Sequence, residues 1–106
     1  IQMPTYTVII PISEGYHTVV FDQGGKFNNF SDYKSKNKPA EQYCTDKDWQ
    51  TYCSHCHEED QQYLTINKVF KWKTGTLFAF NRELFHCSAN FTKPKKAVVL
   101  WLSKLR

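Results

Sequence analysis

Short segments with alternating apolar and polar residues dominate this chain, and this alternation is the strongest constraint on its fold. The run 5–12 alternates with a period of two, which is typical of a strand. A turn signal at 13–15 separates it from a β-branched and aromatic run at 16–21, so we expect the two runs to pair as a hairpin. Pro11 removes a backbone donor, which places it at an edge or at the end of its strand.

Strand patterns return after residue 63. The run 64–72 is followed by a turn signal at 73–75, and the next run, 76–80, is apolar nearly throughout, which predicts burial on both faces. Further strands are expected from residue 85 and over 97–102, the most hydrophobic run. At least five or six strands without a βαβ rhythm predict an all-β domain, an antiparallel sandwich or barrel. The 106 residues suffice for one domain.

The segment 23–62 interrupts these patterns and is interpreted as a polar insertion. Its glycines, asparagines and polar runs are typical of loops. One short helix is expected in it, because Thr45 and Asp48 resemble a capping box ahead of Trp49 and Tyr52. A connection of this length is uncommon unless it is functional or is ordered by its own contacts.

Composition and charge exclude several classes of protein. The 41% hydrophobic content and the 17 aromatic residues exclude a disordered tail. No run is long enough for a membrane helix and no signal peptide is recognisable, so we predict a cytoplasmic protein without a membrane partner. Ile1 is not a methionine and a strand pattern follows it at once, so we expect a fragment cut at its N-terminus.

The net charge of +4 is unevenly distributed. The C-terminal segment 87–106 holds five bases and no acid, which fits either an anionic ligand or a merely solvated surface. The aromatic residues lie at strand periodicity, which favours a core, so no nucleic-acid partner is predicted.

Cysteines in the insertion form a candidate zinc site. Cys53 and Cys56 have the C-x-x-C spacing that brings two sulfurs to one ion, and three further residues could complete the site: His55, His57 and Cys44. Such a site would explain how a polar insertion stays ordered. The alternative is that free cysteines pack as small hydrophobic residues. Cys87 is interpreted as a barrel residue rather than as a ligand.

His86 is the most informative single residue. It follows a strand and a turn, and Lys96 stands ten residues later, at the entry to the last strand. A neutral imidazole can bind iron, zinc or copper, and a nearby cation can neutralise a carboxylate on whatever the metal binds. This pair is consistent with a site for a metal and an anionic ligand, in which both side chains would point into one cavity. The alternative is that His86 is a structural residue whose hydrogen bonds are satisfied within the fold.

The C-terminal half resembles a known family. The run 69–91, with Trp72, Gly75, Leu77 and Phe80 in a W-x-x-G-x-L-x-x-F strand before His86, and the run 95–102 are similar to the 2-oxoglutarate and Fe(II)-dependent oxygenases. They look most like the prolyl-hydroxylase-like members of marine phages and marine metagenomes. The runs 6–21 resemble the family's strand pair around a G-G-x-T element, with Thr18 at the threonine position.

The resemblance implies a double-stranded β-helix, which is a cupin-like jelly roll, and hydroxylation coupled to oxidative decarboxylation of 2-oxoglutarate. It implies that His86 is the distal iron ligand and that Lys96, with Thr18 lining the pocket, binds the small-molecule co-substrate; a Lys or Arg nine or ten residues after the histidine is the family's pattern. The family takes its other two iron ligands from an upstream H-x-D or H-x-E strand, and the five residues before Tyr6 contain no such motif. We therefore expect the chain as given to bind iron poorly.

A hypothesis of another class remains open. The chain could be a non-catalytic β-sandwich that acts as a binding or structural module, metal-free or stabilised by zinc through Cys53 and Cys56. The primary substrate is not predicted in either case. Exposed strand edges in a partial barrel would favour a homodimer.

Overall fold

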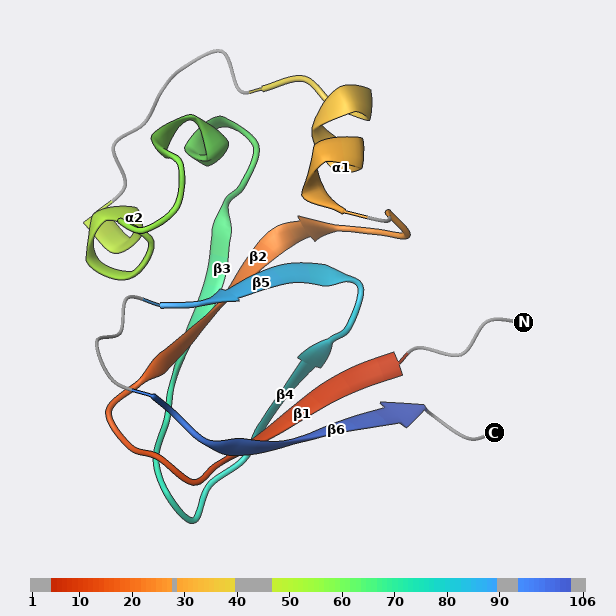
Figure 1. Cartoon of the computed structure of the whole chain (residues 1–106). Helices are drawn as coiled ribbons and strands as arrows, with labels where there is room; N and C mark the ends of the chain where they lie inside the picture. The colour runs from red at the N-terminus through yellow and green to blue at the C-terminus, as the bar shows by residue number, and fades with distance from the viewer. Residues whose placement is uncertain (1–4, 28, 40–46, 90–93, 104–106) are drawn as a thin grey trace.

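Six strands in two antiparallel three-stranded sheets form the framework of the protein (Figure 1). The computed structural model describes residues 5–27, 29–39, 47–89 and 94–103. In chain order the elements are β1 (Thr5–Pro11), β2 (His17–Gly24), α1 (Phe30–Lys36), α2 (Lys47–Tyr52), the 3-10 helix η1 (Glu58–Gln62), β3 (Ile66–Lys71), β4 (Phe78–Asn81), β5 (Leu84–Ser88) and β6 (Ala97–Ser103). The all-β prediction is confirmed at this level.

Strands that follow one another in the sequence mostly belong to different sheets. The first sheet has the order β4-β1-β6 and the second has the order β3-β2-β5. Four of the five consecutive strand pairs therefore lie in different sheets, and only β2 and β3 are neighbours both in sequence and in space.

The expected hairpin over 6–21 is wrong, because β1 and β2 belong to different sheets. The turn between them bonds to both sheets instead of closing a ladder: Ile12 and Ser13 donate their amides to the Lys96 carbonyl at 3.0 Å, and Gly15 donates to the Trp72 carbonyl at 3.2 Å. Gly15 takes a positive φ of 84°, which suits glycine at this crossing. Both strands can then bury apolar side chains against the facing sheet.

An inner cluster fills the space between the sheets. Its buried members come from both layers: Ile9, Val20, Trp72, Phe78 and Phe80. The Trp72 indole donates a hydrogen bond of 2.9 Å to the Thr18 hydroxyl, and both residues are buried. The ring of Phe70 stacks on that of Phe78 at a centroid distance of 4.5 Å.

A second, outer cluster covers the opposite face of the second sheet. It joins that sheet to α2 through five buried residues: Val19, Phe21, Trp49, Cys53 and Ala89. The segment after β2 therefore supplies a helical third layer, formed by α1, α2 and η1 (Figure 1). The expectation of one short helix is confirmed for α2, whereas α1 and η1 were missed. Thr45, the expected cap, lies outside the described residues.

The first sheet has no comparable cover on its own outer face within the described ranges. In β4, Phe78 and Phe80 are buried while Ala79 and Asn81 are exposed, so the predicted burial of 76–80 on both faces is wrong. The edge strand β6 exposes large apolar side chains, among them Leu100 at 43% and Trp101 at 66%. Over the described ranges, no helix has the length and apolar character needed to cross a bilayer.

Candidate metal site and its surroundings

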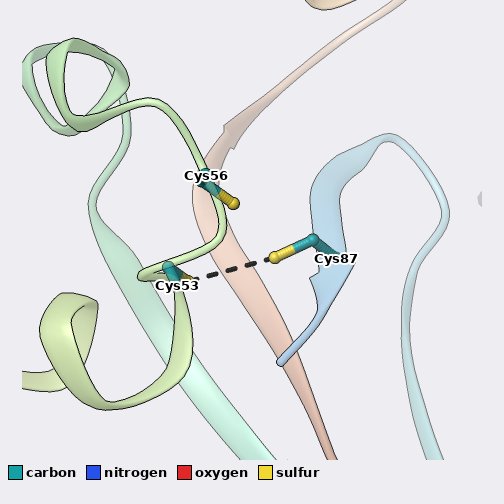
Figure 2. A group of neighbouring side chains, drawn as sticks. All are labelled: Cys53, Cys56 and Cys87. Carbon is teal, nitrogen blue, oxygen red and sulfur yellow. Dashed lines mark hydrogen bonds between the residues drawn. The ribbon is translucent and has the colours of Figure 1, made fainter. Parts of the chain in front are cut away.

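Three cysteines, two from the turn after α2 and one from β5, lie close together (Figure 2). Cys53 follows α2 directly and donates its amide to the Trp49 carbonyl at 2.8 Å. A tight turn then brings Cys56 back, with its amide bonded to the Cys53 carbonyl at 3.0 Å. Cys87 comes from β5, where it lies opposite Val19 of β2. Local turn geometry and sheet register therefore set the three positions independently.

The three sulfur atoms lie within 4.8 Å of one another. The Cys53 and Cys87 Sγ atoms are 4.0 Å apart, and all three cysteines are free thiols. Cys53 is fully buried, while Cys56 and Cys87 are half-buried. The arrangement is one compact group of soft ligand atoms.

The interpretation of Cys87 as a barrel residue outside the site is corrected by this geometry. Along β5, His86 lies opposite Val20 of the inner cluster, and Cys87 lies opposite Val19 of the outer cluster. Alternation along the strand therefore turns Cys87 toward the insertion. The alternation of residues along the strand shows in the sequence that His86 and Cys87 face opposite sides. It identifies Cys87 as part of the cysteine group only when the insertion is known to cover that side of the sheet.

The thiols influence one another's ionisation strongly. A hydrogen bond from Cys53 lowers the pKa of Cys87 to about 7 and outweighs its burial. The same hydrogen bond, together with burial, raises the pKa of Cys53 far above its usual value. Burial raises the pKa of Cys56 to about 11. One thiolate forms readily in the group, at Cys87, and it opposes ionisation of its two neighbours.

The other predicted zinc ligands are distributed differently. His55 is exposed, but its Nε2 lies 3.6 Å from the Cys56 Sγ, at the edge of the group. His57 is exposed at the N-terminus of η1. His57 and Glu59 satisfy H-x-E by their letters, but they lie in this helical turn and not on a strand. Cys44 lies outside the described residues.

His86 lies on the inner side of β5. Its ring centroid is 4.8 Å from that of Phe80, and its Nδ1 is 3.1 Å from the Leu84 carbonyl oxygen. The side chain is nevertheless exposed, because β5 is an edge strand of its sheet.

Lys96 does not take the inward position expected for it. It is exposed, and its carbonyl is held by the turn after β1. Its neighbours face inward instead: the Lys95 Nζ lies 4.6 Å from the centre of the Trp72 ring, and Ala97 packs against the inner cluster. Burial lowers the pKa of Lys95, and the charge of Cys87 partly offsets this effect. The expected convergence of His86 with Lys96 in one cavity is therefore not observed, and Lys95 replaces Lys96 on the inner side.

Thr18 is buried on the same inner side, where its hydroxyl accepts the bond from Trp72. Trp72 thus lies between Thr18 and Lys95, with an indole donor toward the first and a ring face toward the second.

These residues do not complete an iron site. A facial triad needs two histidines and one carboxylate. In the part of the chain that the structure describes, the three cysteines are the only group of three metal-ligating side chains, so His86 has no two partners beside it. We derive no catalytic step through iron.

Comparison of the chain with protein-family models, with curated proteins and with solved structures gave no match.

Proposed function

We propose that this chain is a jelly-roll domain of the 2-oxoglutarate oxygenase type, and that its inner face binds the distal carboxylate of 2-oxoglutarate. The observation that carries the proposal is the interleaved strand order, β4-β1-β6 facing β3-β2-β5. A jelly roll is a two-sheet architecture of eight strands arranged as two Greek keys. The six strands here alternate between sheets in a manner that fits this class better than a meander, in which consecutive strands pair.

The inner-face residues support the ligand class. Lys95 stands nine residues after His86, within the spacing of the resembled family, and its ammonium lies over Trp72. An ammonium group in a half-buried setting can form a charge-assisted bond with a carboxylate. Lys95 therefore replaces Lys96 as the proposed carboxylate anchor. Thr18 would act on this position through Trp72, whose indole donates a hydrogen bond to the Thr18 hydroxyl.

The catalytic part of this proposal is limited by the ligands. Iron requires two ligands in addition to His86, and the described residues do not place them there. Turnover of 2-oxoglutarate is therefore expected only if two further iron ligands join His86. The primary substrate stays unassigned.

Nuclear magnetic resonance of the ¹⁵N-labelled chain tests the proposal directly. Addition of 2-oxoglutarate should shift the indole N–H resonance of Trp72, whereas 2-oxobutyrate, which lacks the distal carboxylate, should shift it much less. Lys95→Ala should abolish the response, and the matched Lys96→Ala variant should retain it.

Equal responses to both acids, or a response that survives in Lys95→Ala, would contradict this function. Either result would favour the non-catalytic β-sandwich module. That alternative predicts no selective binding of a dicarboxylate at the inner face.

A further inference from the structure

We propose that Cys53, Cys56 and Cys87, with His55 as the fourth ligand, form a structural zinc site that ties the helical layer to β5. The site is separate from the inner face discussed above, because the thiols belong to the outer cluster. Zinc retention and the response of the Trp72 indole to 2-oxoglutarate are separate measurements, so the failure of one proposal is distinguishable from the failure of the other.

The sulfur positions fit a tetrahedral ion. A Zn–S bond of about 2.3 Å implies sulfur–sulfur separations of about 3.8 Å in a tetrahedron. The separation between Cys53 and Cys87 is 4.0 Å, and all three sulfurs lie within 4.8 Å of one another. Shifts of less than an ångström, about what a side-chain torsion can supply, would complete the geometry.

His55 is the nearest predicted ligand to the three sulfurs. Its Nε2 is 3.6 Å from the Cys56 Sγ, and a rotation of the exposed side chain about its torsions would bring this nitrogen to the ion. His57, two residues later, stands at the N-terminus of η1, and only His55 of the two histidines has a recorded contact with a sulfur of the group. Three thiolates and one imidazole are a common structural zinc set with no open position, which favours a structural ion over a catalytic one.

Binding is a ligand exchange without electron transfer. Zn²⁺ forms three bonds to sulfur and one to nitrogen, and the three thiol protons pass to solvent. The ion would link residues 34 positions apart in sequence, Cys53 and Cys87, across β2. It would hold α2 and the following turn against β5, one residue from His86.

The experiment uses the whole chain, purified under a phosphine reductant that does not bind zinc strongly. One equivalent of zinc should be retained and should be measurable by competition with a chromophoric chelator. Cobalt substitution should give the intense visible bands of a tetrahedral ion together with thiolate-to-metal charge transfer in the near ultraviolet.

Ligand variants assign the site. Cys56→Ser and Cys87→Ser, at half-buried positions, should each weaken zinc binding by more than about 100-fold, which is above the range typical of outer-shell changes. His55→Asn should weaken it by at least about 10-fold. The matched variant His57→Asn should bind zinc as the parent does. Cys53 is fully buried, so Cys53→Ser is at risk of not folding. The intensity of the thiolate-to-cobalt charge-transfer band of the parent, which reflects the number of bound sulfurs, tests this ligand without that variant.

Several results would overturn the proposal. If the reduced chain retains no zinc, the three thiols pack as small apolar groups and the proposed site does not exist. A zinc affinity unchanged in Cys87→Ser would exclude the link to β5. A stronger loss in Cys44→Ser or His57→Asn than in His55→Asn would refute the assigned fourth ligand.

Discussion

Thr18 and Trp72 show how one buried polar pair fixes the inner face. The Trp72 indole can only donate a hydrogen bond, and the Thr18 hydroxyl accepts it at 2.9 Å while both side chains are buried. The pair joins β2 to the chain just after β3, and Tyr16 packs edge-on against the same ring at a centroid distance of 6.0 Å. The Thr18 hydroxyl and the Tyr16 ring together therefore hold the indole of Trp72 under Lys95.

Removal of that hydroxyl should be costly. Thr18→Val keeps the shape of the side chain but leaves the buried indole N–H without its acceptor, so we expect a loss of about 1–3 kcal/mol in the free energy of unfolding. Thr18→Ser, which retains the acceptor, should lose less, and urea unfolding of both variants measures the difference. A Thr18→Val chain as stable as Thr18→Ser would show that the bond contributes nothing.

His17 predicts a pH dependence of stability. Burial lowers the pKa of its imidazole, and its ring packs 5.0 Å from that of Tyr52. The unfolded chain therefore takes up a proton at a higher pH than the folded chain does, so stability falls as the pH drops through the ordinary histidine pKa. Denaturant midpoints between about pH 7.5 and 5.5 should fall more in the parent than in His17→Gln. Parallel curves for the two proteins would contradict this prediction.

The candidate site was partly predictable from individual residues. Cys53 and Cys56 follow from a spacing rule, because one turn brings i and i+3 together. Cys87 and Lys95 do not, because their roles depend on which face of a strand meets the insertion and which meets the other sheet. Lys95 and Lys96 are chemically identical in the sequence, and a single step along the backbone decides which ammonium reaches Trp72.

At the scale of elements, β2 departs from regular pairing where it leaves β5. Five residues of β2, from Val20 to Gly24, span the distance that three residues of β5 cover between His86 and Leu84, so β2 bulges. Gly24 fits only because it has no Cβ. A methyl group there would collide with the backbone of Glu83 and would lie 2.7 Å from the Leu84 Cα.

Gly24→Ala should therefore force β2 and β5 apart at the bulge. We expect a destabilisation of about 1–3 kcal/mol, typical of overpacking against rigid backbone. Gly75→Ala is the matched control, because Gly75 has open space around it and only its positive φ of 83° resists the change, at a cost of about 1–2 kcal/mol. The midpoint temperatures of thermal unfolding measure the loss of stability in each variant. Amide exchange should also rise along β5 in Gly24→Ala alone, and uniform exchange in both variants would refute the local origin.

Strand existence and strand pairing differ in how far the sequence determines them. The period of two over 5–12 and the β-branched and aromatic run 16–21 correctly placed strands at β1 and β2, because both signals are local. They do not report which strand is the neighbour. That choice depends on burying both apolar faces between two sheets at once, and the short turn at 13–15 suggested a local hairpin that this burial overrides.

For the whole molecule, the three layers are covered unequally. The second sheet packs on both faces, against the first sheet and against the helical layer. The first sheet packs on its inner face, and its edge strand β6 carries an exposed apolar row, Val98, Val99, Leu100, Trp101 and Leu102. An exposed, hydrophobic edge strand is a template for pairing with another chain, which is the physical basis for the expected homodimer.

We therefore predict that the chain self-associates through β6. The molar mass of the parent, measured by light scattering after gel filtration, should rise with concentration. Leu100→Lys, which places a charge in the middle of β6, should keep the chain monomeric at the same concentrations. Ile12→Lys is the matched control, because Ile12 is also exposed, at 56%, but lies outside every strand. A parent that stays monomeric, or an Ile12→Lys chain that dissociates as fully as Leu100→Lys, would show that the β6 edge does not mediate association. Association that persists in Leu100→Lys would place the contact on another surface.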